Sequence, residues 1–505
     1  MGLPFRRLTL AFKSDFTLGN VLERLAEHNG DRRLVEEADG GLTLTYAQAA
    51  KRVRRWAGGI ARKATPGDRV VIATPNGYEM LLLCLAASRA GAIPVPINPQ
   101  LTKAEFGHVV SNSEAALVIR AATKVDGADP LAESVPADPA DVAALFYTSG
   151  TTGKPKGVEL SHRSLVGSFA RVAAIDPLLT GRFEAVIALP VAHIMGFAAL
   201  LGMACAGIPV YLLPKFNPVR VLDAIEQRRS GIFIGVPTMY RMLLEAGAEE
   251  RDLSSIRAWG AGADAMPSDL AARFKKLGAT VTLPVIGSIG EAMFFEGYGM
   301  VELGGGAAAK VSPPFLDVGL GSDAFGFPLP GYQFRVVDPE SGERLPAGRT
   351  GELLIRGPGV TSGYWGDAGA TSATVTEEGW LRTGDMARLG PFGSVLFEGR
   401  AKDVIKVGGY SVYALEVERA IEEHPDVLEA AVVAIPDERK GELPGAVVRL
   451  APKKKLNAKA MEAFAAERLA DYKVPRRWLA VDELPRTGTN KVKKRELVSR
   501  FESSS

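Results

Sequence analysis

The 505-residue sequence has little cysteine and almost no net charge. Its two cysteines, Cys84 and Cys205, lie in the apolar runs MLLLCLAA and LLGMACAG, so we expect buried thiols and neither a disulfide framework nor a zinc site. The 60 basic and 58 acidic residues leave a formal net charge of +2, which gives no argument for a nucleic-acid partner. The N-terminal residues lack an apolar segment of signal-peptide length, so a cytoplasmic location is expected.

One long stretch, from Ala185 to Pro214, lacks Asp, Glu, Lys and Arg, and its length would suit a membrane-spanning helix. Proline and glycine nevertheless divide it into pieces of the size of buried strands and short helices. These dividing residues are Pro190, Gly196, Gly202, Gly207 and Pro209. The stretch therefore predicts part of a buried α/β core rather than a membrane span.

Helical and strand-like patterns alternate through the first part of the chain. TLGNVLERLAEH and TYAQAAKRVRRWAGGIARK have apolar residues at helical spacing, whereas RVVIATP, AIPVPIN, AALVIRA, GIFIGVP and TVTLPVIG read as short buried strands. This alternation predicts a largely parallel sheet covered on both faces. After Gly319, short alternating strands with frequent turn residues predict an antiparallel, barrel-like subdomain, and a compact α+β unit follows Arg400.

A chain of this length exceeds what one hydrophobic core can hold, so at least two domains are expected. We place a large α/β domain, with two covered sheets and the small barrel-like subdomain, at residues 1–401. A small α+β domain is placed at residues 402–505.

The most informative stretch runs from Leu145 to His162, LFYTSGTTGKPKGVELSH. Glycines let backbone N–H groups converge on an anion, hydroxyls add donors and lysines supply charge, so the stretch predicts a polyphosphate cradle rather than a surface turn. It is not a Walker A loop, because its two inner glycines are too close and a proline follows the first lysine. The candidate phosphate-binding residues are Thr148, Ser149, Gly150, Thr151, Thr152, Gly153, Lys154, Lys156 and Gly157.

Eight further segments follow in order: LPVAHIMGF, GADAMP, EGYGMVE, GELLIRG, GYWGD, GWLRTGD, GRAKDVIKVGGYSVYALEVE and PRTGTNKVKKREL. Together with YTSGTTGKPKG, they resemble the successive motifs of the adenylate-forming superfamily of acyl-CoA synthetases, aryl-CoA ligases, luciferases and peptide-synthetase adenylation domains. The resemblance covers roughly residues 15 to 500 and is closest to fatty-acyl-CoA synthetases.

The resemblance implies that ATP activates a carboxylate as an acyl-adenylate, by positioning and charge stabilisation. It places Mg²⁺ near Glu302, whose carboxylate suits a hard cation that bridges phosphates. Tyr298 would stack on adenine, Asp385 would accept the ribose hydroxyls, and Arg400 would donate to the ribose or the α-phosphate. A core aromatic and a buried Asp–Arg pair are the structural alternatives. The remaining nucleotide contacts fall on Gly262, Ala263, Asp264, Gly299, Met300 and Val301.

The resemblance also implies that the small domain is mobile and turns about a hinge at Lys402, which is counted among the nucleotide-contacting residues. One of its faces would serve adenylation through the catalytic Lys491. From Ala451 to Ser505 there are 14 basic and 7 acidic residues, so only the motif singles out this lysine. The face for thioester formation would carry the catalytic Lys406 and, against coenzyme A, Gly408 and Gly409.

The acyl pocket is expected where the small and apolar residues of three segments meet. We interpret its one histidine as a wall near the substrate carboxylate and not as a base. Since these segments carry no acidic or basic side chain, they predict a medium or long fatty acid rather than an amino acid or acetate. The expected wall residues are His193, Gly196, Phe197, Val236, Thr238, Met239, Gly260 and Ala261.

Three positions depart from the family's pattern. Val301 stands where threonine is common and removes a hydroxyl that could contact the α-phosphate, Asn490 replaces a glycine, and Ala414 replaces a proline. The charged catalytic groups are all retained, so we expect an active enzyme.

The sequence thus predicts an ATP-dependent fatty-acyl-CoA synthetase that uses Mg²⁺ with ATP and releases AMP and pyrophosphate. Three alternatives stay open: an acyl-AMP ligase that loads a carrier protein, a 4-coumarate-like aryl-CoA ligase, and a catalytically silent nucleotide- or acyl-binding sensor. GRAKDVIKVGG lacks the insertion that carrier-loading forms often have near the hinge. Peripheral membrane contact and a homodimer are compatible with the sequence, which does not decide either.

Overall fold

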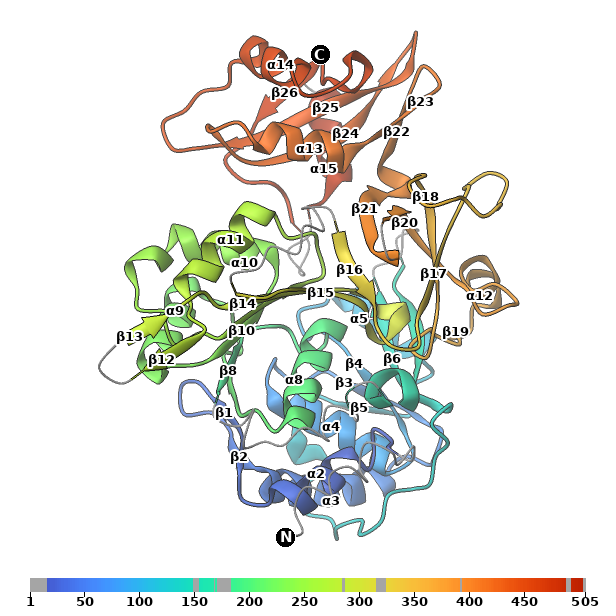
Figure 1. Ribbon diagram of the computed structural model, residues 1–505. Helices are drawn as coiled ribbons and strands as arrows, with labels where there is room; N and C mark the ends of the chain where they lie inside the picture. Colours follow the sequence, from blue (N-terminus) through green and yellow to red (C-terminus); the bar gives the residue numbers. More distant parts are fainter. Residues whose placement is uncertain are drawn as a thin grey trace. The chain divides into compact units, whose positions relative to one another are not determined.

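The computed structural model describes residues 16–148, 154–167, 169, 183–283, 287–314, 324–390, 393–486 and 492–502. Its contacts divide the chain into two units (Figure 1). The first comprises Met1–Gln333 and Ile355–Arg382, and the second comprises Phe334–Leu354 and Thr383–Ser505. The contacts do not locate a hinge, so the boundary at Lys402 stays a prediction.

The first unit is built on a large sheet with the strand order β16-β15-β14-β11-β10-β8-β9-β1-β2. Neighbours from β9 to β14 pair in parallel, as the sequence predicted. The strands are β1 (Arg33–Glu37), β2 (Thr43–Thr45), β8 (Ala185–Ile187), β9 (Val210–Leu212), β10 (Ile232–Gly235), β11 (Ala258–Gly262), β14 (Met293–Met300), β15 (Gly305–Ser312) and β16 (Ala324–Pro328). Parallel strands need crossover connections, which are α8 (Ile194–Ala206), α9 (Pro218–Arg228), α10 (Pro237–Glu245) and α11 (Ser268–Leu277).

Both faces of this sheet are covered, and the strand period explains how. Successive side chains point to opposite faces, so Phe233 and Ile234 of β10 enter two different hydrophobic clusters. Phe233 packs with residues of α9, α10 and α11, and Ile234 with the cluster that includes α8. Near-continuous apolar strands are what a sheet buried on both faces requires.

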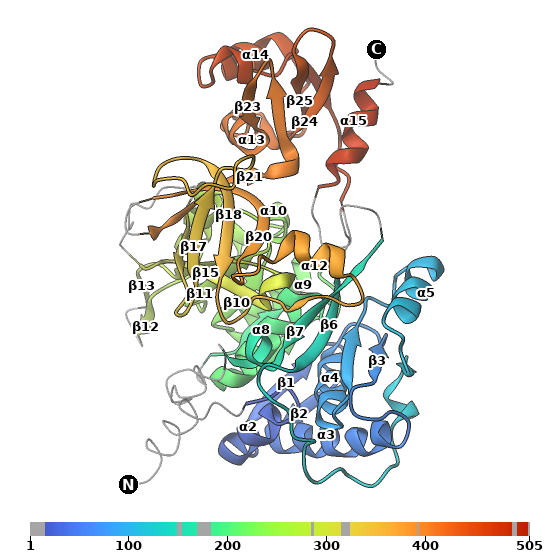
Figure 2. The ribbon, with the colours of Figure 1, turned by 90° about the vertical axis from the view of Figure 1, so that its right-hand side faces the viewer.

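A second, three-stranded sheet has the order β4-β3-β5 and parallel pairing. Its strands are β3 (Arg69–Ile72), β4 (Ile93–Pro96) and β5 (Leu117–Ile119). Helices α2 (Val21–Asn29), α3 (Tyr46–Ala61) and α4 (Tyr78–Arg89) lie side by side in Figures 1 and 2, and α5 (Lys103–Asn112) follows β4. A reciprocal capping box of Thr45 and Gln48 fixes the start of α3.

One predicted strand lies elsewhere. TVTLPVIG was expected in the parallel sheet, but β12 (Val281–Leu283) pairs only with β13 (Gly287–Ile289), in an antiparallel two-stranded sheet. Val281 and Ile289 are each 40% exposed. The place beside β11 belongs to β14, whose Phe294 is fully buried and whose pairing spans Met293 to Gly297. The prediction was wrong because valine and leucine alternating with threonine suit a strand with little cover.

The uncharged stretch folds as predicted into β8, α8 and β9. Within the residues that the structure describes, no helix is long and apolar enough to cross a membrane. Cys205 of α8 and Cys84 of α4 are both buried, as expected. Burial raises the pKa of both thiols, that of Cys205 to about 12.

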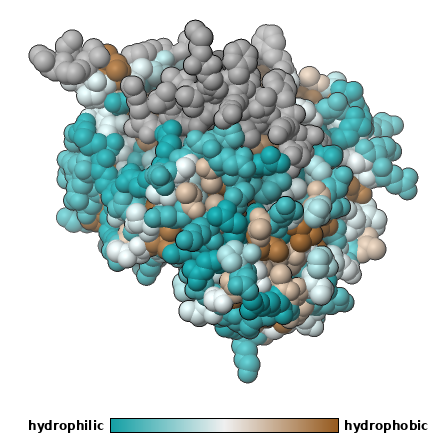
Figure 3. Space-filling model, turned by 90° about the horizontal axis from the view of Figure 1, so that it is seen from below, coloured by the Kyte–Doolittle hydropathy of each residue, from teal (hydrophilic) through white to brown (hydrophobic). Residues whose placement is uncertain are grey.

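Figure 3 shows one face of the molecule, seen from below the view of Figure 1. Its described surface is mostly hydrophilic, and hydrophobic residues gather there in small groups among hydrophilic ones. Peripheral membrane contact stays a prediction.

The second unit contains most of four strands in the order β17-β18-β20-β21, followed by a small α+β fold. These strands are β17 (Gln333–Val337), β18 (Gly351–Arg356), β20 (Leu381–Leu389) and β21 (Val395–Arg400). The α+β part has the sheet order β23-β22-β25-β24, with β26 beside β25. Its elements are β22 (Val404–Val407), β23 (Tyr410–Tyr413), α13 (Ala414–Glu422), β24 (Val427–Asp437), β25 (Gly441–Leu450), α14 (Ala458–Ala466), β26 (Arg477–Ala480) and α15 (Lys494–Glu502). The predicted fold class is confirmed.

Candidate functional site

The hairpin of β6 (Val142–Thr148) and β7 (Lys156–Ser161) brackets the predicted phosphate loop. Thr148 pairs with Lys156 and Tyr147 with Gly157, so the residues on either side of the loop face each other across the hairpin. A strand, not a helix, follows Lys154 and its proline, as expected. Ser149, Gly150, Thr151, Thr152 and Gly153 lie outside the described residues.

Lys156 is held by a short segment from far along the chain. β19 (Gly363–Tyr364), of the GYWGD motif, pairs antiparallel with β7. The Nζ of Lys156 lies 3.1 Å from Oδ2 of Asp367 and 5.5 Å from the ring centroid of Tyr364. The N–H of Ala370 and then the ammonium of Lys156 lower the pKa of the Asp367 carboxyl. The ammonium is thereby kept beside the predicted loop.

Glu302 follows β14 in the turn η5 (Val301–Leu303) and is 7% exposed. The hydroxyl of Tyr364 donates a hydrogen bond of 2.9 Å to its Oε1, and the N–H of Thr361 donates to its backbone carbonyl at 2.8 Å. Burial, and then the Glu302 charge, raise the pKa of Tyr364 well above its usual range, so the phenol stays protonated and can donate. Sequence reasoning quoted GYWGD as a motif but gave Tyr364 and Asp367 no role.

The predicted nucleotide wall lies where β11 and β14 end. A Cβ on Gly262 would lie 3.2 Å from the carbonyl oxygen of Gly297, so the two strands approach closely there. Ala263 has a φ of 67°, a left-handed conformation that a non-glycine residue keeps only where its surroundings require it. Asp264 is exposed and its carboxylate accepts the N–H of Ala265 at 2.9 Å.

The motif around Tyr298 forms a second tight approach. A Cβ on Gly299 would lie 1.7 Å from the carbonyl oxygen of Gly305, at a bulge between β14 and β15. Only glycine fits there without moving the backbone. Tyr298 is 7% exposed, and Met300 and Val301 are half-buried. Stacking of Tyr298 on adenine stays a prediction.

The expected acyl wall residues come from the start of α8, the start of α10 and the end of β11. His193 caps α8, because its Nδ1 accepts the N–H of Met195 at 3.2 Å. This bond gives the ring a structural role and fits the interpretation that it is not a base. Phe197 is fully buried with its edge on Phe146, the ring centroids being 5.2 Å apart. The methyl carbon of Met195 lies 3.4 Å from where a Cβ on Gly262 would stand.

Gly260 makes room in this wall. A Cβ there would lie 3.2 Å from Cγ1 of Ile234 and 3.4 Å from Cε1 of Phe295. Its carbonyl accepts the hydroxyl of Tyr240 at 2.7 Å. Val236 and Thr238 begin α10 beside it, Val236 being buried and Thr238 half-buried. The side chains nearest to a Cβ on Gly260 are thus apolar, and the carbonyl oxygen of Phe233 lies 3.6 Å from it.

In the second unit, Asp385 of β20 and Arg400 of β21 stand opposite each other, and Arg400 Nε lies 2.8 Å from Asp385 Oδ1. Asp385 is 2% exposed. The guanidinium also donates to the carbonyl of Thr383 at 3.3 Å, and the Thr383 hydroxyl accepts the N–H of Asp385 at 3.0 Å. The structure therefore brings these two predicted residues together in one fixed pair.

Gly408 and Gly409 form the two-residue turn between β22 and β23, since Val407 pairs with Tyr410. Both have positive φ, 55° and 88°, the turn that two glycines favour in a hairpin. Lys406 is exposed and its Nζ donates to the Ser411 hydroxyl at 3.0 Å. These three residues thus share one hairpin, as a common thioester-forming face requires.

Other predicted positions differ in what the structure says of them. Lys402 lies exposed in the turn η7 (Ala401–Asp403), and Ala414 does begin α13. Lys491 and Asn490 lie outside the described residues.

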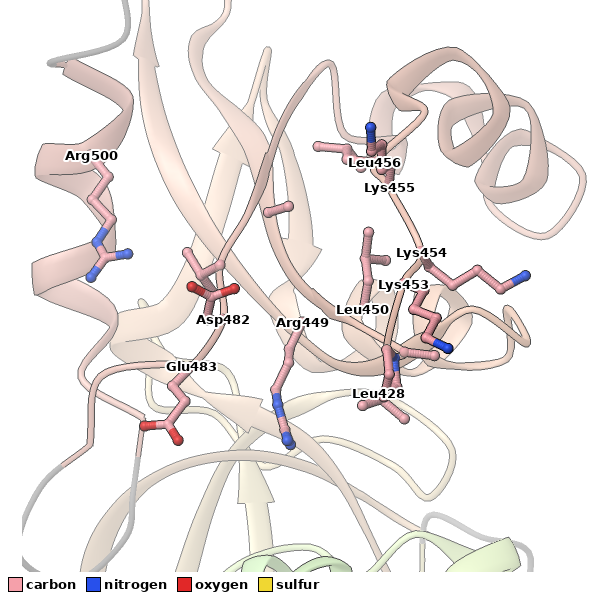
Figure 4. A pocket seen from close by; sticks show the side chains of 14 residues that line it. Leu428, Arg449, Leu450, Lys453, Lys454, Lys455, Leu456, Asp482, Glu483 and Arg500 are labelled. Carbon is pink, nitrogen blue, oxygen red and sulfur yellow. The ribbon is translucent and has the colours of Figure 1, made fainter. Parts of the chain in front are cut away.

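A pocket of about 840 Å³ lies in the α+β part (Figure 4), and none of the predicted site residues is among the residues that line it. It is lined by apolar residues such as Leu428 and Leu450, and by charged residues of both signs. The side chains of Lys453 and Lys454 extend away from those of Asp482 and Glu483. They do not converge on one point, so the pocket indicates no ligand.

Comparison with known proteins identifies the chain's relatives. The family described as AMP-binding enzyme matches residues 22–365, and AMP-binding enzyme C-terminal domain matches residues 416–491. A feruloyl-CoA synthase of Amycolatopsis sp is 35% identical over 488 residues, 92% of this chain and 95% of the relative. A long-chain-fatty-acid–CoA ligase of Bacillus subtilis is 34% identical over 361 residues, 71% of this chain and 61% of the relative. The crystal structure of ATP-bound MatB from Rhodopseudomonas palustris superposes with a TM-score of 0.83 at 28% identity, covering 97% of this chain and 100% of that one.

Proposed function

The chain belongs to the AMP-binding enzyme family, and from this premise we propose that it is a fatty-acyl-CoA synthetase for medium- or long-chain acids. It is an acid–thiol ligase that uses ATP, a carboxylic acid and coenzyme A. The acid is activated as an acyl-adenylate with release of pyrophosphate, and the acyl group then passes to the thiol with release of AMP.

The observation that carries the proposed substrate is the apolar surrounding of Gly260. Ile234 and Phe295 flank it, and Met195 lies against the neighbouring Gly262. An aliphatic chain needs such a lining and no charged partner beyond its carboxylate. The similarity to the long-chain-fatty-acid–CoA ligase of Bacillus subtilis supports the same class.

A specific observation also favours a second class, an aryl acid of the hydroxycinnamate kind. The relative named feruloyl-CoA synthase matches over 92% of this chain, which is more than the fatty-acid ligase covers. Glycines along β11 would admit a flat ring as well as an aliphatic chain. Loading of a carrier protein is disfavoured, since only the short turn η7 joins β21 to β22.

Mg²⁺ is proposed to arrive with ATP and to meet Glu302. The described residues contain no group of three or more His, Cys, Asp or Glu that could hold a metal ion. A single buried carboxylate nevertheless fits Mg²⁺, which takes its other oxygens from phosphates and water. When bound, the ion would neutralise charge that develops on the phosphates.

The protein's own groups would bind and orient the reactants. Lys154 and Lys156, with the loop between β6 and β7, would hold the β- and γ-phosphates, and Asp385 would accept the ribose hydroxyls. Lys491 would bring its charge to the α-phosphate and the substrate carboxylate. The small domain would then turn about Lys402, so that Lys406, Gly408 and Gly409 meet the pantetheine arm.

The experiment that tests this function measures pyrophosphate release and thioester formation by the purified protein with Mg·ATP. The acids run from octanoate to stearate, with ferulate and cinnamate beside them, each with and without coenzyme A. Formation of acyl-CoA from the fatty acids supports the proposal. Formation of product from ferulate alone would instead identify an aryl-CoA ligase. Adenylate formation that ignores coenzyme A indicates a carrier-loading enzyme.

The Lys491→Ala variant separates an enzyme from a sensor. An enzyme should lose adenylation with this change while it still binds ATP, as calorimetry can measure. A sensor would bind ATP equally in both forms and release no pyrophosphate in either.

A further inference from the structure

We propose that the GYWGD segment, residues 363–367, is a positioning element that fixes both charged groups of the phosphate site. Tyr364 orients the carboxylate of Glu302, and Asp367 orients the ammonium of Lys156. The proposal rests on the proposed roles of Glu302 toward the metal and of Lys156 toward the phosphates. It assigns Tyr364 and Asp367 functions that act through Glu302 and Lys156.

The first contact is the hydrogen bond from the Tyr364 hydroxyl to Oε1 of Glu302, which is 2.9 Å long and partly buried. A hydrogen bond to a buried carboxylate is stronger than one between neutral groups, and it fixes the carboxylate plane. The hydroxyl holds Oε1, so the carboxylate is kept in one orientation. Residues that hold a metal ligand in this way are often as important as the ligand.

The backbone of the segment holds Tyr364 in place. Tyr364 pairs with Val158 of β7, and the N–H of Trp365 donates to the carbonyl of Gly157 at 2.8 Å. The hydroxyl of Thr361 donates to the carbonyl of Glu159 at 2.6 Å. The segment is thereby fixed to the strand that leaves the phosphate loop.

The second contact restrains Lys156. A lysine ammonium sits on four rotatable carbons and has no preferred direction of its own. Asp367 fixes one side of it at 3.1 Å, and the ring of Tyr364 lies under it at 5.5 Å. Tyr364 therefore touches both charged groups, one through its hydroxyl and the other through its ring.

The two contacts can be separated by single-atom changes. Tyr364→Phe removes the hydroxyl, and with it the bonds to Glu302 and Thr374, but keeps the ring beside Lys156. Asp367→Asn removes the charge beside Lys156 and leaves Tyr364 unchanged. Tyr46→Phe is the matched control, because its buried hydroxyl also makes a hydrogen bond, of 2.8 Å to the carbonyl of Ala204, in the same unit.

Calorimetry of ATP binding, with Mg²⁺ and with a chelator, gives the decisive readout without turnover. Tyr364→Phe should weaken Mg·ATP binding about 10- to 100-fold, and leave metal-free ATP binding as in the wild type. Asp367→Asn should weaken ATP binding both with Mg²⁺ and with the chelator. In turnover, Tyr364→Phe should lower kcat and raise the Mg²⁺ requirement, while KM for the acid stays unchanged.

Three results would overturn the proposal. The first is equal Mg·ATP binding by Tyr364→Phe and Tyr46→Phe. The second is an equal loss of ATP affinity in Tyr364→Phe with and without metal, and the third is an unchanged Mg²⁺ effect in Glu302→Gln. The last result removes the premise on Glu302. Failure of the proposed function is a different outcome. If the wild-type protein binds Mg·ATP but converts no acid, the calorimetric comparison of the variants still tests the positioning roles of Tyr364 and Asp367.

Discussion

Asp385 and Arg400 face each other across β20 and β21, and the guanidinium Nε lies 2.8 Å from a carboxylate that is 2% exposed. The arginine holds one oxygen of the buried carboxylate in a defined direction. A ribose with two neighbouring hydroxyls is the kind of ligand that an oriented acceptor can select.

Replacing Asp385 with asparagine should weaken AMP binding by roughly 1.5–3 kcal/mol, because hydrogen bonds to a charged acceptor are lost. Calorimetry with AMP measures this directly. Glu398→Gln is the matched control, since Glu398 pairs with Arg388 in the same hairpin at 2.7 Å and has no proposed ligand. Equal losses in both variants would show damage to the hairpin instead of a ribose contact.

Gly260→Ala should shift the substrate preference towards shorter acids. The new methyl would stand 3.2 Å from Ile234 and 3.4 Å from Phe295, so it fits after a small adjustment and fills space in the wall. We expect kcat/KM for stearate to fall about tenfold or more relative to octanoate. A uniform fall across the acid series, measured by pyrophosphate release, would place the substrate elsewhere.

Val301→Thr should speed adenylation. Threonine supplies a hydroxyl donor beside Glu302, and one added hydrogen bond to the α-phosphate is worth about 0.5–1.5 kcal/mol. The rate should rise by a few-fold up to about tenfold, as single-turnover pyrophosphate release can detect. A slower variant with unchanged ATP binding would mean that the valine packs where the phosphate does not reach.

His162 should make the first unit less stable in acid. Its Nδ1 accepts the N–H of Leu18 at 3.0 Å, and burial lowers the pKa of the ring from 6.5 to about 4. Above pH 6.5 the His162 ring is neutral in both the folded and the unfolded protein, and its contribution to the free energy of unfolding is fully present. Between pH 6.5 and 4 the unfolded chain binds a proton at His162 but the native protein does not. The free energy of unfolding therefore falls by about 3 kcal/mol over this range.

Urea denaturation at a series of pH values checks this loss. His162→Gln keeps an acceptor for Leu18 but cannot titrate, so its free energy of unfolding should rise relative to that of the wild type as the pH falls from 6.5 to 4. A difference that stays constant with pH would contradict the lowered pKa.

The alternation of helical and strand-like patterns made most of the fold predictable. Two features were beyond the sequence. The first is that β14, and not TVTLPVIG, pairs with β11. Both segments have apolar residues at strand spacing, so the sequence does not distinguish them. The bond of Tyr364 to Glu302 joins residues 62 positions apart, and no local pattern encodes it.

For the candidate site, the sequence named residues whose roles stay predictions. A motif names residues such as Glu302 and Asp385, but the partners that orient them follow only from packing. Asp385 and Arg400 were both expected to contact the nucleotide, and the pair that they form is the structural alternative to that role. Tyr364 was missed because its motif was quoted without a chemical role.

Cys84 and Cys205 are both buried with raised thiol pKa values, and a thiol reacts with maleimides and iodoacetamides only as the thiolate. At neutral pH the two cysteines of the native protein should therefore react very slowly with these reagents. A single cysteine introduced on an exposed position of each unit would then take a fluorophore pair without removal of the native thiols. Energy transfer between the two dyes could follow domain movement through a catalytic cycle in an otherwise unaltered protein.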